Sequence, residues 1–310
     1  MPPLTICVTG GAGFIGSHVA EALLAAGHRV LIIDDLSSGR QENLPEGAEF
    51  HHLDIRSPEA AALLAGRGVE VLVHHAAQMD VRRSVADPVF DAEVNVAGTL
   101  NLLEAGRRGA LKQVIFASTG GAIYGDQLVY PAGEDHPAWP LSPYGVAKLA
   151  VEHYLYYYWR EYRLSATCLR YANVYGPRQN PHGEAGVVAI FLNRLLSGRQ
   201  AVINGDGLQT RDYVYVGDVV RANLAAVGRQ GFETFNVGTG RETTVVELYQ
   251  LLAGALGITQ PPAFGPPKPG EQRRSCISSR LLEERLGVRP EVGLEEGTQR
   301  TAAWFASHTG

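Results

Sequence analysis

The chain has 310 residues, of which 45% are hydrophobic and 19% are charged, and a net charge of −5 at pH 7. This is the make-up of a globular protein with one large or two ordinary domains. The charge gives no electrostatic basis for binding nucleic acid or an anionic membrane. No apolar run approaches the roughly 20 residues of a membrane span, and the first residues lack the features of a signal peptide. Three cysteines in unrelated contexts indicate a reducing cytoplasm rather than a disulfide framework.

Strand-like and helix-like segments alternate through the first half of the chain. An apolar run at 4–10 leads into helical spacing at 14–27. Further strand-like runs follow at residues 29–34, 49–54, 70–77, 112–119 and 165–174. Continuous apolar strands separated by helices are typical of a parallel sheet covered on both faces. The predicted fold class is therefore α/β, with a doubly wound parallel (Rossmann) sheet.

Beyond residue 173 the pattern becomes irregular and rich in glycine and proline. Helical spacing returns at 189–198 and 245–257, and a strand-like run occupies 232–238. We therefore expect a Rossmann domain over 1–172 and a smaller C-terminal domain over 173–310. Part of 205–236 can return to the first sheet.

The first motif with chemistry is the glycine run Gly10, Gly13 and Gly16, between a predicted strand and a predicted helix. Glycines there permit a tight turn and close approach of the backbone to a pyrophosphate, which the helix N-terminus then faces. Asp34 closes the second strand, where an acidic residue accepts hydrogen bonds from ribose hydroxyls and repels a 2′-phosphate. The alternative is a glycine-rich turn with a capping aspartate. The pattern favours NAD over NADP.

The stretch SPYGVAK places Tyr144 and Lys148 one helical turn apart, because Ser142 and Pro143 form a good helix start. Alone, such a pair is common surface decoration. Beside a nicotinamide cofactor, the ammonium and the positive ring both favour the phenolate, which makes the tyrosine a usable base. Ser118 and Thr119 end a predicted strand just before it and offer hydroxyls to a substrate.

This set of glycines, terminal hydroxyl and Tyr-x-x-x-Lys resembles the extended short-chain dehydrogenase/reductase superfamily over nearly the whole chain. The resemblance is greatest to its NAD-dependent nucleotide-sugar epimerases and dehydratases, especially the UDP-glucose (UDP-galactose) 4-epimerases. It implies catalytic roles for Tyr144, Lys148 and either Thr119 or Ser118, with Thr119 preferred. It also implies the cofactor-binding residues Gly10, Gly13, Phe14, Ile15, Gly16, Asp34, Asp35, Ser37, Ser38, Gly39, Asp54, Ile55, Ala76, Ala77, Gln78, Asn95, Tyr144, Lys148 and Tyr171.

The same resemblance implies a site for a UDP-sugar in the second domain. Asn173 and Arg211 would hold the diphosphate, and Ala201 and Ile203 would lie near the uracil. Ser275 falls where some members place a tyrosine that walls the sugar pocket. The full implied set of substrate-binding residues is Thr119, Tyr144, Asn173, Val187, Ala201, Ile203, Arg211 and Ser275.

The implied activity is 4-epimerisation of UDP-glucose and UDP-galactose through a 4-keto intermediate, with the N-acetylated pair as further substrates. UDP-glucuronate 4-epimerisation or decarboxylation on the same fold is one alternative, and a non-catalytic NAD-binding protein is a more distant one. Gly120 and Gly121 replace the acid and base that dehydration needs. No metal is expected, because His51–His52 and His74–His75 lack accompanying ligands. Family members pair through helices near 87–107 and after Tyr144, so we expect a homodimer.

Overall fold

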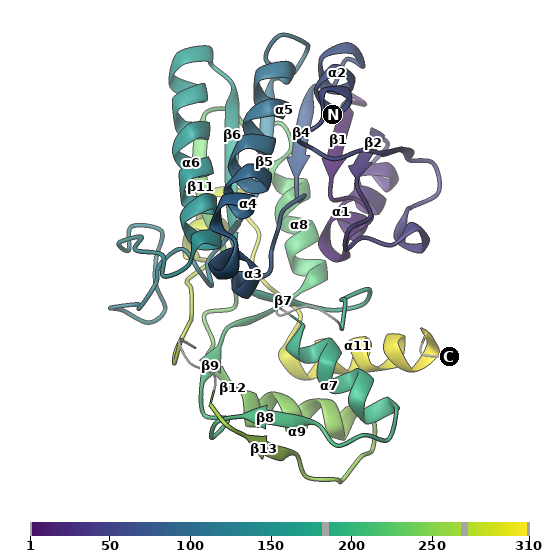
Figure 1. Ribbon diagram of the computed structural model, residues 1–310, viewed down its shortest axis with the longest axis vertical. Coiled ribbons are helices and arrows are strands. Elements are labelled where there is room, and N and C mark those ends of the chain that lie inside the picture. The colour runs from purple at the N-terminus through teal and green to yellow at the C-terminus, as the bar shows by residue number, and fades with distance from the viewer. Residues whose placement is uncertain (1, 182–185, 268–271, 309–310) are drawn as a thin grey trace.

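The computed structural model describes residues 2–181, 186–267 and 272–308. Figure 1 shows an upper unit built on a sheet and a smaller lower unit beneath one end of its strands. Within the described residues the sheet has seven strands in the order β11-β6-β5-β4-β1-β2-β3, all parallel. Its strands are β1 (Thr5–Thr9), β2 (Arg29–Asp34), β3 (Glu49–His52), β4 (Val71–His74), β5 (Gln113–Thr119), β6 (Ser165–Tyr171) and β11 (Phe232–Val237). The predicted strands and the doubly wound parallel sheet are confirmed.

Helices cover both faces of the sheet. On one face α1 (Phe14–Ala25) and α8 (Val216–Ala226) pack together. On the other face lie α2 (Pro58–Gly66), α5 (Gly98–Gly106) and α6 (Pro143–Tyr162). The shorter helical segments are the 3₁₀ turn η1 (Gln41–Asn43), α3 (Val81–Ala86), α4 (Pro88–Ala92) and the π-helical turn η2 (Glu93–Ala97). In the described residues no helix has the length and apolarity to cross a membrane.

Strand β5 shows why its sequence is apolar without alternation. Ile115 and Ala117 belong to the core beneath α1 and α8, whereas Val114 and Phe116 belong to the core beneath α2, α5 and α6. Successive side chains of a strand point to opposite faces, and here both faces are buried. The same alternation carries on to the end of the strand, where it separates two polar residues.

The lower unit has its own core, between α7 (Val187–Leu196), α9 (Val245–Ala255) and α11 (Leu294–His308). Paired short strands accompany it: β7 (Asn173–Tyr175) with β10 (Tyr213–Tyr215), β8 (Val202–Asn204) with β13 (Ala263–Gly265), and β9 (Thr210–Arg211) with β12 (Thr243–Thr244).

The chain crosses between the two units more than once. Helix α8 and strand β11 return to the upper unit, as the sequence allows for part of 205–236. Helix α10 (Arg280–Leu286) also returns, since Leu282 lies in the core beneath α1 and α8. A single boundary at residue 173 therefore does not describe the division of the chain, because α8, β11 and α10 follow it and belong to the upper unit.

A directed chain of hydrogen bonds joins three strand and helix ends at the carboxyl edge of the sheet. The Thr99 hydroxyl donates to the Asn95 carbonyl (2.7 Å), so it accepts from His74 Nε2 (2.8 Å). His74 Nδ1 then accepts from the Thr9 hydroxyl (2.6 Å), which in turn accepts from the Ala76 amide (3.2 Å). The imidazole ring is thereby held as the neutral tautomer with its proton on Nε2. Burial lowers the pKa of His74 to about 3.

The titration of His74 gives a stability prediction. The folded chain keeps this ring neutral, whereas the unfolded chain takes up a proton below pH ~6.5, so low pH favours unfolding. Each such histidine removes about 1.4 kcal/mol of stability per pH unit between its unfolded and folded pKa values. His74→Gln keeps one donor and one acceptor but does not titrate. We measure the free energy of unfolding of both proteins by urea titration from pH 6.0 to 4.5. We expect it to fall with pH by about 1.4 kcal/mol per pH unit less in His74→Gln than in the wild type. Equal slopes in both proteins would contradict this account.

Candidate active site

The turn between β1 and α1 has the shape of a phosphate cradle. Gly10 adopts a positive φ of 68°. A Cβ at Gly16 would lie 2.1 Å from the Gly10 carbonyl oxygen, and one at Gly10 would lie 2.7 Å from the Ala76 amide nitrogen. Only glycine permits both approaches. Helix α1 has no acidic residue in its first turn, so its free N–H groups meet no competing negative charge. These features fit a dinucleotide pyrophosphate.

Asp34 ends β2 beside this turn and is 6% exposed. Its carboxylate accepts hydrogen bonds from the Ala12 and Leu36 amides, both at 2.9 Å. Burial raises the pKa of Asp34 above its ordinary value, although both amides favour the charged form. The close approach of Gly39 leaves no room for a side chain there, because its Cβ would meet Asp34 Oδ1 at 2.8 Å. The carboxylate is therefore held rigidly, with lone pairs left for ribose hydroxyls.

The other predicted cofactor residues lie along the same edge of the sheet. Gln78 and Asn95 exchange hydrogen bonds, from the Gln78 amide to Asn95 Oδ1 and from Asn95 Nδ2 to the Gln78 carbonyl, both at 2.9 Å. Asn95 lies in the π-helical turn η2, a feature often found at functional sites. The Tyr171 hydroxyl accepts from Asn223 Nδ2 (2.8 Å). Asp54 is paired with Arg56 at the surface, and Ile55 is buried against Gly98.

Helix α6 presents Tyr144 and Lys148 as predicted. Ser142 caps it by accepting from the Gly145 amide (3.2 Å), and Pro143 occupies its first position. Lys148 is 4% exposed, and its Nζ donates to the Ala117 carbonyl at 2.9 Å. This Nζ lies 5.8 Å from the centroid of the Tyr144 ring. Phenol and ammonium are thus neighbours at the end of β5.

The two candidate hydroxyls, Ser118 and Thr119, have different partners. The Thr119 side chain lies close enough to the Tyr144 phenol to lower its pKa by hydrogen bonding. The Ser118 hydroxyl instead donates to Glu152 Oε1 (2.6 Å), whose carboxylate is paired with Arg170 at 2.6 Å. Alternation along β5 causes this difference. The structure therefore brings Thr119, and not Ser118, to the tyrosine.

Burial shifts the pKa values of both members of the Tyr144–Lys148 pair in the chain alone. Burial, and then the charge of Asp91, raise the pKa of the Tyr144 phenol, and the Thr119 hydrogen bond lowers it only in part. Burial lowers the pKa of Lys148 to about 8, against the opposing effects of Asp91 and Glu152. In the chain alone the neutral phenol is favoured. The expectation that the ammonium and the positive cofactor ring together favour the phenolate concerns the protein with NAD bound, and it stays a prediction.

Two predicted substrate residues border the same glycine. A Cβ at Gly121 would lie 3.7 Å from Asn173 Oδ1 and 4.0 Å from Thr119 Oγ1. The amide of Asn173 thus lies close to the candidate catalytic hydroxyl. Arg211 ends β9, and Val187 begins α7 in the lower unit.

Ala201 and Ile203 do not present side chains to a ligand. They are 0% and 1% exposed, within the core of the lower unit.

Ser275 lies between the two units and is 3% exposed. Its amide donates to the Thr210 carbonyl (3.2 Å). Two residues later, Ile277 packs so closely on Gly120 that a Cβ there would lie 2.4 Å from its Cδ1. The segment after Ser275 thus reaches the residue next to Thr119. The neighbouring stretch 268–271 lies outside the described residues.

Sequence reasoning did not identify three buried charged residues. Asp91 hydrogen-bonds Gln78 and Asn95, and Glu152 and Arg170 form the pair behind Ser118. Spacing offered one signal, since Asp91 is four residues before Asn95 and Glu152 four after Lys148. Over the described residues no cluster of histidine, cysteine, aspartate or glutamate has the make-up of a metal site.

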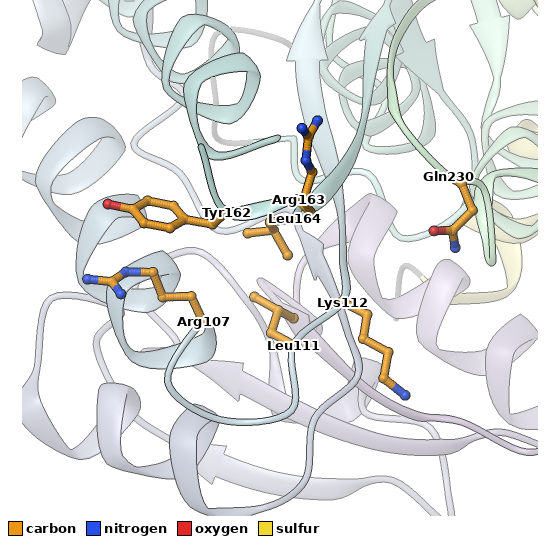
Figure 2. A pocket seen from close by; sticks show the side chains of 7 residues that line it. All are labelled: Arg107, Leu111, Lys112, Tyr162, Arg163, Leu164 and Gln230. Atoms are coloured by element: carbon orange, nitrogen blue, oxygen red, sulfur yellow. The ribbon is translucent and has the colours of Figure 1, made fainter. Parts of the chain in front are cut away.

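A cavity of about 500 Å³ lies at the opposite edge of the sheet, before β5 and β6 (Figure 2). Arg107 lies over the Tyr162 ring there, 4.7 Å from its centroid. Two of its cations already have carboxylate partners, Arg107 in Glu104 and Lys112 in Glu70. The cavity is distant from the carboxyl edge that gathers the predicted site residues.

Comparison with known proteins assigns the chain to a family. A model of the NAD-dependent epimerase/dehydratase family matches residues 6–238. A UDP-glucose 4-epimerase of Mycolicibacterium smegmatis is 50% identical over 96% of this chain and 97% of that protein. The crystal structure of the Thermotoga maritima UDP-glucose 4-epimerase with UDP-glucose is 48% identical, with a TM-score of 0.96 over 99% of this chain and 100% of that one.

A second crystal structure, that of the Thermus thermophilus UDP-glucose 4-epimerase in complex with NAD, is 45% identical. Its TM-score is 0.92, and the match covers 98% of this chain and 100% of that one. The family and the cofactor predicted from the sequence are thereby confirmed. The chain belongs to the NAD-dependent epimerase/dehydratase family.

Proposed function

We propose that this protein is a UDP-glucose 4-epimerase, an isomerase that interconverts UDP-glucose and UDP-galactose. The observation that carries the proposal is the meeting of Thr119, Tyr144 and Lys148 at the carboxyl edge of the sheet, beside the glycine cradle and Asp34. The close likeness to proteins named UDP-glucose 4-epimerase supports it.

The roles proposed for the chain's own residues follow from this geometry. NAD, when bound, supplies the acceptor and donor of hydride at C4 of the sugar. Tyr144 takes the proton of the 4-hydroxyl and returns it, and Thr119 orients that hydroxyl through its hydrogen bond to the phenol. Lys148, held by the Ala117 carbonyl, contributes the positive charge that favours the phenolate. The positive cofactor ring adds to this charge and opposes the effect of burial on Tyr144.

The chemistry next to Thr119 argues against loss of water. Gly120 and Gly121 follow it and have no acid or base to offer. Packing also restricts Gly120, since Ile277 occupies the space of a side chain. A 4-keto sugar formed here can accept hydride again but finds no group at these positions to remove water across C5 and C6. Return of hydride to the other face of C4, after the keto sugar turns over in the site, therefore gives the epimer.

We propose that the protein binds its substrate mainly through the nucleotide part. We propose that two residues bind the diphosphate: Asn173, beside Gly121, and Arg211, at the end of β9. Guanidinium and amide groups donate hydrogen bonds to phosphate oxygens. Val187 at the start of α7 completes this side of the site. A weakly held hexose can then turn over while UDP stays bound.

The proposed assembly is a homodimer. Large apolar side chains face solvent on α3, α4 and α6: Val85 is 63% exposed, Val89 67%, Val146 53% and Tyr157 49%. An apolar groove runs beside them, lined by Pro88, Val89, Ala92, Val96 and Leu100. A monomer rarely exposes such a surface without a partner. The proposed location is the cytoplasm, which the free and buried state of Cys7, Cys168 and Cys276 supports.

Turnover of UDP-galactose tests the function. We expect the purified protein to form UDP-glucose without added NADH, measured by chromatography of the nucleotide sugars. Tyr144→Phe should lower kcat by roughly 10²–10⁴, the scale for removing a general base. Tyr154→Phe, on the exposed side of the same helix, is the control and should leave kcat unchanged. A product lighter by one water indicates dehydration, turnover of UDP-glucuronate alone indicates the uronic-acid reactions, and no product with any of them indicates a non-catalytic protein.

Cofactor selectivity tests the role of Asp34. Asp34→Ala removes the acceptors for the ribose hydroxyls and the charge that repels a 2′-phosphate, so it should weaken retention of NAD and relax the preference over NADP. The checks are the NAD content of the protein as isolated and the Kd values for both dinucleotides. Glu42→Ala, on an exposed side chain of the following loop, is the matched control. Equal affinity of the wild type for NAD and NADP would refute this role.

Sugar selectivity tests the position of Ser275. A serine there leaves the sugar pocket wider than a tyrosine would, so we expect turnover of UDP-GlcNAc and UDP-GalNAc as well as the plain hexoses. Ser275→Tyr should reduce kcat/KM for the N-acetylated pair by roughly 10–200-fold relative to the hexoses. Ser275→Ala keeps the wall low and should spare both pairs. An equal loss of both activities in Ser275→Tyr would place the wall elsewhere.

A further inference from the structure

Lys148 carries a positive charge in a place that water does not reach. Its side chain is 4% exposed, and its Nζ contacts the Ala117 carbonyl and the face of the Phe116 ring, 4.7 Å from the centroid. A carbonyl and a ring stabilise a cation only in part, and burial of a charge is costly unless an opposite charge lies near. A buried carboxylate is the natural partner.

Glu152, four residues along α6, is already committed elsewhere. Its carboxylate receives Arg170 Nε (3.0 Å) and Nη2 (2.6 Å), together with the Ser118 hydroxyl (2.6 Å). A full positive charge on Arg170 therefore neutralises it. Lys148 obtains less from Glu152 than the spacing of the two residues suggests.

Asp91 has no such cation. It lies in α4 and is 1% exposed. Its Oδ1 accepts from Gln78 Nε2 and Asn95 Nδ2, both neutral amides at 3.0 Å. Its Oδ2 is buried and has no hydrogen-bond partner among the described residues. A buried carboxylate oxygen without a partner calls for an explanation beyond local capping.

Packing brings this carboxylate to the active site. Helix α4 and the turn η2 both contact α6, the helix of Tyr144 and Lys148. The negative charge of Asp91 raises the pKa of the Tyr144 phenol and the pKa of Lys148, and at Lys148 it raises the pKa more than Glu152 does. One carboxylate therefore influences the protonation of both the phenol and the ammonium.

We propose that Asp91 is a positioning residue of the reaction, whose buried carboxylate is the counter-charge that retains the proton on Lys148. Asp91 also accepts hydrogen bonds from Gln78 and Asn95. The same carboxylate therefore holds the loop assigned to the cofactor and stabilises the charge of Lys148. The inference rests on the proposed function of Tyr144 and Lys148. Its expected consequence is that removal of the negative charge alone makes Lys148 easier to deprotonate.

Other titratable groups around Lys148 do not replace Asp91. Tyr144 and Glu152 lie on α6, and Glu152 is paired with Arg170 of β6. His74, at the end of β4, and His75, the next residue, face it as neutral rings, because burial lowers the pKa of each to about 3. Asp91 is therefore the one unneutralised carboxylate that acts on Lys148 among the described residues.

Nuclear magnetic resonance of labelled lysine tests the proposal directly. The sequence contains only three lysines, Lys112, Lys148 and Lys268, so protein labelled with ¹³C and ¹⁵N in lysine gives few signals. Lys148→Met identifies the signal of Lys148. Asp91→Asn keeps an oxygen acceptor for Gln78 and Asn95 but removes the charge. We expect the midpoint of the Lys148 titration to fall by about one pH unit in this variant, a tenfold change in its protonation constant.

Matched variants separate the charge from the fold. Glu93→Gln removes a carboxylate two residues away whose side chain is 59% exposed, and it should leave the titration unchanged. Asp91→Glu keeps the charge and should keep the midpoint near that of the wild type. If Asp91→Asn does not fold, Asp91→Ser removes the same charge with a smaller side chain. An unchanged Lys148 midpoint in the neutral variant overturns the proposal.

Kinetics give a second readout. With Asp91→Asn, kcat should begin to fall on the alkaline side about one pH unit earlier than in the wild type, while KM for the UDP-sugar stays within about twofold. A purely structural role for Asp91 would lower kcat equally at all pH values, and that result overturns the proposal. A coupled Lys148 titration in a protein that turns over no UDP-sugar would instead overturn the proposed function and leave the Asp91–Lys148 coupling intact.

Discussion

The burial of a single ammonium, that of Lys148, constrains the elements around it. Its Nζ donates a hydrogen bond to the carbonyl of Ala117 on β5. The negative charges of Asp91 on α4 and Glu152 on α6 oppose the effect of burial on its pKa. A buried charge tolerates little displacement of its partners, because each lost contact leaves an uncompensated group in a medium of low dielectric. The strand end and the two helices are therefore held in one arrangement, and Tyr144 is held with them.

The parallel sheet explains why the remaining groups meet at the same place. All its strands end at one edge, so the glycine turn after β1, Asp34 at the end of β2 and Thr119 at the end of β5 come together there. The lower unit approaches this edge through Asp212, which is 1% exposed. Its carboxylate accepts from the amides of Thr239, Gly240 and Ile277, and so joins its own segment to two others near Gly120.

Patterns that are local in sequence predicted local structure well. The strands, the glycine turn and the start of α6 depend on periodicity or on neighbouring residues, and the structure contains them. Long-range partners were not predictable. The sequence offered both Thr119 and Ser118, with Thr119 preferred, because both close β5. Their different partners become visible only in the structure, where Ser118 points to Glu152. The role of Asp91 was invisible for the same reason, since its effect depends on how α4 packs against α6.

The pKa of Tyr144 shows what a motif cannot reveal. Tyr-x-x-x-Lys indicates that the ammonium is near, but burial of the phenol acts in the opposite direction and prevails in the chain alone. In the proposed reaction, C4 of the sugar loses and regains the same hydrogen within one site. Conversion of UDP-galactose deuterated at C4, in ordinary water, measures this. We expect UDP-glucose that retains the deuterium at C4, by mass spectrometry. Replacement of that deuterium by hydrogen from the solvent would contradict this expectation.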